Sequence, residues 1–192
     1  MTLSLAIDRD AFSIITIADR GVRSPAWHDR MRWPSAGDSH LALSLDRDSQ
    51  RSIWAAQLDS AVMAADRAVL LVAEGIGCFA TAWWARLSPA HYVSRVAGAV
   101  LFDPGPEPVG EHGRPFAAPP VRLPFPSVVL AGADDDTRSL AHGWGSRMIA
   151  GTRQRDGDQP AWRTAQRLMR RMTAGFVERD VERMMAIRSG LR

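Results

Sequence analysis

The stretch Ala68-Val-Leu-Leu-Val-Ala-Glu-Gly-Ile-Gly-Cys78 decides the fold. Its first part, Ala68 to Ala73, is apolar throughout, as expected for a strand buried on both faces of a parallel sheet. Gly75 and Gly77 then allow an abrupt turn, because glycine adopts backbone conformations that other residues avoid. The segment 78–87 that follows is rich in Ala and Trp and is expected to be a helix. The stretch therefore predicts a buried strand, a tight turn and a helix in direct succession.

Strand and helix patterns alternate along the rest of the chain. The expected strands cover 13–18, 41–45, 96–102, 127–131 and 147–150, and the expected helices cover 49–65, 137–146 and 161–188. This alternation predicts an α/β three-layer sandwich with a mostly parallel sheet and helices on both faces. A chain of 192 residues suits one domain, so we expect residues 1–192 to form a single unit. Functional groups should then gather at the carboxyl ends of the strands.

Composition and charge exclude several classes of protein. All 24 basic residues are Arg, and residues 151–192 hold ten of them against five acids, a local charge of +5. A basic tail on a near-neutral body is weak evidence for nucleic-acid binding, and we expect none. The single cysteine excludes an internal disulfide and a multi-cysteine zinc site. No segment suits a membrane span or a signal peptide, which predicts a cytoplasmic protein.

The predicted turn also has the order of a nucleophile elbow, in which a strand, a sharp turn and a helix present a catalytic residue. Several segments extend this likeness: Trp54-Ala-Ala-Gln-Leu-Asp-Ser-Ala-Val62, Val69-Leu-Leu-Val-Ala-Glu-Gly-Ile-Gly-Cys78, Leu123-Pro-Phe-Pro-Ser127, Ala131-Gly-Ala-Asp-Asp135 and Trp144-Gly-Ser-Arg147. In this order and spacing, the chain resembles the small serine hydrolases of the YdeN and retinoblastoma-binding-protein-nine family over roughly residues 12–150. The resemblance implies an α/β-hydrolase fold.

The same resemblance implies a degenerate catalytic triad. The position of the family's nucleophilic serine falls on Gly75, which has no side chain with which to attack a carbonyl. The family's acid falls on Asp135, with Asp134 as the alternative register, and is retained. The family's histidine base falls near Asp156, and no histidine follows His142. A carboxylate cannot replace imidazole as the base that cycles near neutral pH, so the serine-hydrolase route is expected to be lost.

Three functional hypotheses follow. The preferred one is a non-catalytic homologue that retains the fold as a binding or assembly protein, with room for a small ligand in the former catalytic pocket. The second is an enzyme with altered chemistry that uses Glu74 and Asp135 as acid and base. The third is a hydrolase whose nucleophile is Cys78, assisted by His28.

Carboxylates at the predicted sheet edge raise the question of a metal. Glu74, Asp134, Asp135 and Asp136 all follow predicted strands, and carboxylates alone suit Mg²⁺ or Ca²⁺. Acidic turns are nevertheless common without a metal, and we expect neither a metal nor a cofactor. The remaining histidines are scattered along the chain and are expected to be structural or on the surface.

The C-terminal segment carries a separate prediction. Residues 161–188 show an amphipathic helical pattern with many Arg, and 161–176 are expected to cover the sheet. Residues 177–192 add apolar positions and Arg beyond the expected core. This surplus predicts contact with a partner protein or with a second copy of the chain.

Overall fold

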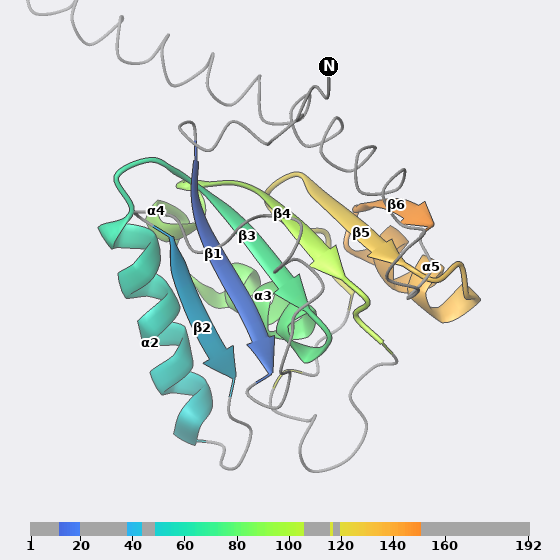
Figure 1. The fold of residues 1–192 in the computed structure, drawn as a ribbon, viewed down its shortest axis with the longest axis horizontal. Coiled ribbons are helices and arrows are strands. Elements are labelled where there is room, and N and C mark those ends of the chain that lie inside the picture. The colour runs from blue at the N-terminus through green and yellow to red at the C-terminus, as the bar shows by residue number, and fades with distance from the viewer. Residues whose placement is uncertain (1–11, 20–37, 44–48, 106–115, 117–119, 151–192) are drawn as a thin grey trace, which may run out of the picture.

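Six parallel strands form one sheet in the order β2-β1-β3-β4-β5-β6, as Figure 1 shows. The structure, a computed structural model, describes residues 12–19, 38–43, 49–105, 116 and 120–150. The strands are β1 (Phe12–Asp19), β2 (Ser39–Leu43), β3 (Ala68–Glu74), β4 (Val96–Phe102), β5 (Ser127–Ala131) and β6 (Arg147–Ala150). Every neighbouring pair is parallel, so all six carboxyl ends meet at one edge of the sheet. The predicted α/β-hydrolase-like architecture is confirmed.

Apolar runs account for the central strands. All residues of β4 are buried, and β3 is buried from Val69 to Ala73. The register pairs Leu71 with Ala99 and Ala73 with Leu101, so the two strands present their side chains to the same faces. Strands of this kind lack the apolar–polar alternation of a half-exposed sheet, because both of their faces are covered.

The helices in the described part of the chain pack on one face of this sheet. They are α2 (Ser49–Ala64), α3 (Ile76–Leu87), α4 (Ala90–Val93) and α5 (Asp135–Gly143). Leu58 of α2 and Trp84 of α3 are fully buried, and both belong to one core cluster with alternate residues of the strands. The other alternate residues, such as Val72 and Val100, form a second buried cluster on the opposite face. The helix expected at 161–188 lies outside the described residues.

Element boundaries differ from the sequence prediction where capping decides them. Helix α5 begins at Asp135 rather than at residue 137, because the Asp134 side chain accepts a hydrogen bond from the Thr137 N–H at 2.8 Å. It ends at Gly143, before Trp144 and the positive-φ Gly145. Helix α3 begins at Ile76, immediately after the turn, and the short helix α4 was not predicted.

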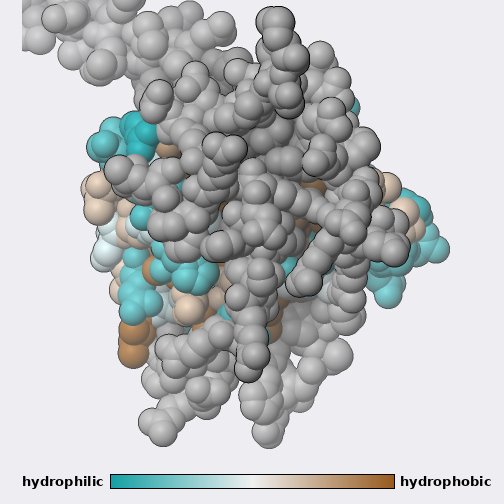
Figure 2. Space-filling view, in the orientation of Figure 1, coloured by the Kyte–Doolittle hydropathy of each residue, from teal (hydrophilic) through white to brown (hydrophobic). Residues whose placement is uncertain are grey.

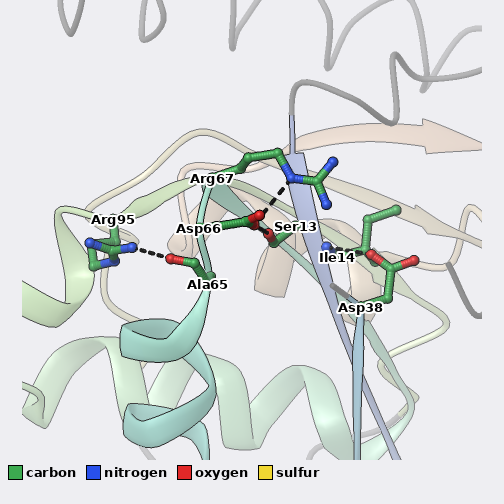
Figure 3. Close-up of polar contacts among 7 residues, drawn as sticks. All are labelled: Ser13, Ile14, Asp38, Ala65, Asp66, Arg67 and Arg95. Carbon is green, nitrogen blue, oxygen red and sulfur yellow. Dashed lines mark hydrogen bonds and ion pairs between the residues drawn. The ribbon is translucent and has the colours of Figure 1, made fainter. Parts of the chain in front are cut away.

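Polar side chains tie the strands together at the amino edge of the sheet (Figure 3). The Ser13 hydroxyl, which is fully buried, donates to an Asp66 carboxylate oxygen at 3.1 Å, and the Arg67 Nε donates to the same oxygen at 3.3 Å. The Ile14 N–H donates to Asp38 at 3.0 Å. These contacts link β1 to the start of β3 and to the residue before β2, and they fix the edge opposite to the predicted site.

Arg95 closes the carboxyl end of α2 at the same edge. Its Nε donates to the Val62 carbonyl at 3.0 Å, and a terminal nitrogen donates to the Ala65 carbonyl (Figure 3). The last carbonyls of a helix have no partner within the helix, and an arginine satisfies them well.

The surface over α2 mixes hydrophilic and hydrophobic side chains on the face seen in Figure 2. Two large apolar side chains of this helix, Ile53 and Met63, are exposed by 58% and 49%. Within the described residues, no helix is long and apolar enough to cross a membrane.

Candidate functional site

The turn between β3 and α3 has the geometry of a nucleophile elbow. Gly75 lies in this turn with φ 57° and ψ −126°, a conformation that costs residues with a Cβ atom free energy. Its N–H donates to the Phe102 carbonyl at 3.0 Å, and its own carbonyl accepts from the Cys78 N–H at 3.1 Å. These bonds fix the turn to the end of β4 and to the first turn of α3. The position that would carry a nucleophile is therefore well defined.

Gly77 brings α3 close to the sheet. A Cβ atom built on Gly77 would lie 2.7 Å from the Ile17 carbonyl oxygen, which is closer than real Cβ atoms come. It would also lie 3.1 Å from the Ile17 Cγ2, which is an unusually short contact. The helix can approach β1 this closely because residue 77 has no side chain. The two glycines thus have different roles: Gly75 permits the backbone conformation, and Gly77 permits the helix packing.

No side chain projects from the turn at Gly75, the position that the family resemblance assigns to the nucleophile. A Cβ atom built on Gly75 meets no heavy atom within 4 Å, so the described surroundings leave open space there. At residue 75 the turn therefore presents only backbone atoms, without the hydroxyl or thiol that a nucleophile for acyl transfer needs.

The acidic positions after β5 have structural partners. Asp134 caps α5: besides the Thr137 N–H it accepts from the Thr137 hydroxyl at 2.9 Å, and these hydrogen bonds lower the pKa of Asp134. Asp135 forms an ion pair with Arg138, and its side chain is 95% exposed. Strand β4 separates β5 from β3, which places the ends of those two strands about 10 Å apart at the usual strand spacing. Asp135 thus lies at the same edge of the sheet as the turn, with its carboxylate exposed to solvent.

Cys78 does not have the environment of a reactive thiol. The residue is fully buried, and its Sγ lies 3.5 Å from the Phe102 carbonyl oxygen. Burial raises the pKa of Cys78 well above its usual value, and the nearby charge of Glu74 raises it further. The thiolate is the nucleophilic form of cysteine, so this environment argues against Cys78 as a catalyst. Its proposed partner His28, and the base position Asp156, lie outside the described residues.

A second carboxylate beside Glu74 was missed in the sequence. Asp103 directly follows β4, its φ is 37°, and its N–H donates to the Leu130 carbonyl at 2.9 Å. Both carboxylates raise the pKa of Cys78 and are half-buried at the same sheet edge. The signal that could have found Asp103 is its place at a strand end beside the elbow.

In the parts of the chain that the structure describes, no three metal-ligating side chains converge on one point, so Glu74 and Asp134–136 do not form a ligand set.

One histidine has a defined partner in the sheet. His40 of β2 lies with its Nδ1 2.8 Å from the hydroxyl of the buried Thr16, and burial lowers the pKa of His40. Because Thr16 is fully buried in the middle of β1, this hydroxyl is inaccessible to a substrate. The contact joins the edge strand to the sheet, as a structural histidine would.

Fold and elbow together define the class: an all-parallel sheet whose central strand ends in a nucleophile-elbow turn is an α/β-hydrolase-like protein. The family model described as serine hydrolase matches residues 26–155. The chain therefore belongs to the serine hydrolase family.

A solved structure extends the comparison. A YdeN-like hydrolase from Pectobacterium atrosepticum has a similar fold, with a TM-score of 0.59 and 13% sequence identity. The match covers 83% of this chain and 93% of that chain. Among curated proteins, none matches this chain. The family and fold implied by the sequence motifs are confirmed.

Proposed function

We propose that this protein is a non-catalytic member of the serine hydrolase family that acts by binding or assembly. The observation that carries the proposal is Gly75 in an intact elbow. The turn retains its backbone conformation and its hydrogen bonds, but the nucleophile position has no side chain. The fold is therefore retained without the group that forms the acyl intermediate.

A second argument comes from the base. Hydrolysis through a serine nucleophile needs an imidazole that takes the proton of the serine hydroxyl and later gives it to the leaving group. The chain has no histidine after His142, and the resemblance puts Asp156 at the base position. Restoring the serine alone would leave it without activation, and an unactivated serine is a poor nucleophile.

Chemical labelling tests the proposal directly. Purified full-length protein is treated with a fluorophosphonate probe and assayed against a panel of p-nitrophenyl esters, beside a catalytically active serine hydrolase as positive control. We expect no labelling and no turnover above buffer. Stoichiometric labelling at any residue, together with turnover, would contradict the proposal and would favour altered chemistry in the former pocket.

A pair of variants separates the missing nucleophile from the missing base. Gly75→Ser alone is expected to remain inactive, whereas Gly75→Ser combined with Asp156→His is expected to gain weak hydrolysis if the imidazole reaches residue 75. Strong turnover from the single variant would reveal a base that the sequence does not identify. Circular dichroism of each variant provides the folding control.

A further inference from the structure

A pocket of about 240 Å³ lies on the helix-covered side of the sheet, away from the elbow. Its walls come from α3, from the segment that leads into β5, and from the residue that follows α5. The described lining residues are Phe79, Ala82, Ala85, Arg86, Phe116, Val121, Arg122, Leu123, Pro124 and Trp144. Arg86 is in the last turn of α3, whereas Gly75 precedes its first turn. The pocket is thus a second candidate site, separate from the nucleophile position.

Backbone contacts hold one wall of the pocket in place. The Leu123 N–H donates to the Trp144 carbonyl at 2.9 Å, which joins the segment before β5 to the segment before β6. Gly145, with φ 65°, makes room for Arg122: a Cβ atom there would lie 2.9 Å from the Arg122 Cγ. The absence of a side chain at residue 145 therefore lets the stem of Arg122 lie against this turn.

Aromatic rings form the buried wall. Phe79 and Trp144 meet edge to face, with ring centroids 5.5 Å apart and an interplanar angle of 72°. Phe116 is also buried and meets Trp83 in the same manner at 5.7 Å. Paired rings of this kind are rigid, so the apolar wall is present before any ligand binds.

The charge of the pocket lining determines which class of ligand the pocket can bind. Arg86 and Arg122 both line the pocket and are both exposed to solvent. Within the described part of the chain, neither guanidinium has an ion pair or a hydrogen bond. The described lining contains no Asp or Glu. Val121, which also lines the pocket, is exposed by 50%, so the exposed part of the lining is both apolar and positively charged. A ligand that suits it has an apolar body and a negative charge.

Size limits the ligand. At roughly 30 Å³ per water molecule, the pocket volume equals about eight waters, which is below the usual range for drug-sized ligands. We propose that this pocket binds a small organic monoanion with one ring-sized apolar group, of the aromatic carboxylate class. The carboxylate contacts Arg86 and Arg122 at the mouth, and the ring lies against Phe79 and Trp144. This site does not depend on whether the elbow is catalytic.

An NMR titration of the full chain with benzoate tests the proposal. We expect saturable amide shifts at Phe79, Arg86, Leu123 and Trp144, at millimolar benzoate. Benzyl alcohol provides the ring without the charge, and inorganic phosphate provides charge without a ring. Both should bind more weakly than benzoate. The proposal would be overturned if benzyl alcohol or phosphate bound as tightly as benzoate. It would also be overturned if the amide shifts caused by benzoate were centred on Gly75 and not on the pocket residues.

Variants at the exposed arginines give a second measurement with little risk to folding. Arg86→Gln and Arg122→Gln should each weaken benzoate binding by about two- to fivefold, the range of an exposed ion pair. Arg138→Gln, an exposed arginine outside the pocket, is the matched control and should leave the affinity unchanged. Ala82→Leu should abolish binding by filling the pocket. Unchanged affinity in both pocket arginine variants, or an equal loss in the control, would show that these charges do not hold the ligand.

Discussion

Substitutions at three glycines should separate backbone strain from steric overlap at the elbow. At Gly75 a side chain has open space but must adopt φ 57° and ψ −126°. At Gly77 the φ is ordinary, but a Cβ atom would lie 2.7 Å from the Ile17 carbonyl oxygen. At Gly132 neither problem exists, because the nearest heavy atom to the added Cβ is an Asp134 carboxylate oxygen at 3.7 Å.

The expected free energies follow from these differences. Strain at Gly75 costs about 1–3 kcal/mol, and Gly→Ala offsets about 0.4–1 kcal/mol by reducing the entropy of the unfolded chain. Gly75→Ala should therefore lower the free energy of unfolding by at most about 2.6 kcal/mol, with a midpoint of about 1.3 kcal/mol, which is roughly 3–5 °C in Tm for a chain of this length. Gly77→Ala should cost about 1–3 kcal/mol or more through overlap. Gly132→Ala should be neutral or slightly stabilising.

The assay is urea unfolding followed by circular dichroism, with Tm from calorimetry as a second measurement. Serine variants distinguish the two effects, because backbone strain does not depend on the size of the side chain, whereas steric overlap increases with that size. Gly75→Ser should match Gly75→Ala, whereas Gly77→Ser should be less stable than Gly77→Ala. A Gly75→Ala protein as stable as the Gly132→Ala protein, which carries no strain, would refute the strained elbow. A much greater loss in Gly75→Ser than in Gly75→Ala would refute the open space.

Three further predictions concern other parts of the chain. Cys78 should react with iodoacetamide in urea but hardly at all in the native protein at pH 8, because burial raises its pKa; rapid native alkylation, measured by mass spectrometry, would contradict this. Asp134→Ala should lower the Tm at pH 7 by removing the cap of α5. Folding lowers the pKa of Asp134, so the stabilisation from its carboxylate is present above the unfolded pKa of about 4 and is lost as the pH falls through the folded pKa. The Tm values of Asp134→Ala and of the unsubstituted chain, measured by calorimetry, should therefore converge at low pH. Deleting 178–192 should leave a folded protein, with a Tm shift of at most a few degrees, and should change the oligomeric state found by light scattering or abolish binding to a co-purified partner; an unchanged oligomeric state, with a truncated form that unfolds or aggregates, would mean that this segment belongs to the core.

Most of the sheet could be predicted because its strands are apolar runs between strong turn signals. The predicted bounds of β4, β5 and β6 agree with the structure. Strand β2 was misplaced by two residues at its start, because this edge strand begins with Ser39 and His40, and its polar residues resemble a loop. Its hydroxyl–imidazole contact with β1 is a tertiary effect that the local sequence does not carry.

The candidate site was predictable in position but not in environment. The pattern Glu74-Gly-Ile-Gly77 located the elbow correctly at the end of β3. The burial of Cys78 depends on β4 packing over the start of α3, which joins residues 24 positions apart in sequence. Asp103 was missed for the same reason, because its proximity to the elbow is set by the pairing of β3 with β4.

The two ends of α3 differ in charge, and this difference supports the proposed ligand site at the carboxyl end of the helix. At the elbow end, the half-buried carboxylates Glu74 and Asp103 both act on the neighbouring thiol as negative charges. They disfavour a negatively charged ligand at the helix N-terminus, although its backbone N–H groups would otherwise attract one. At the other end, Arg86 and Arg122 line an apolar pocket that has no acidic residue among its described lining. Glycine at residue 75 avoids the strain that a serine would have in the same backbone conformation, so the fold is more stable with glycine by about the amount expected for Gly75→Ala. An anionic ligand is thus expected at the arginine end of α3 rather than at the elbow.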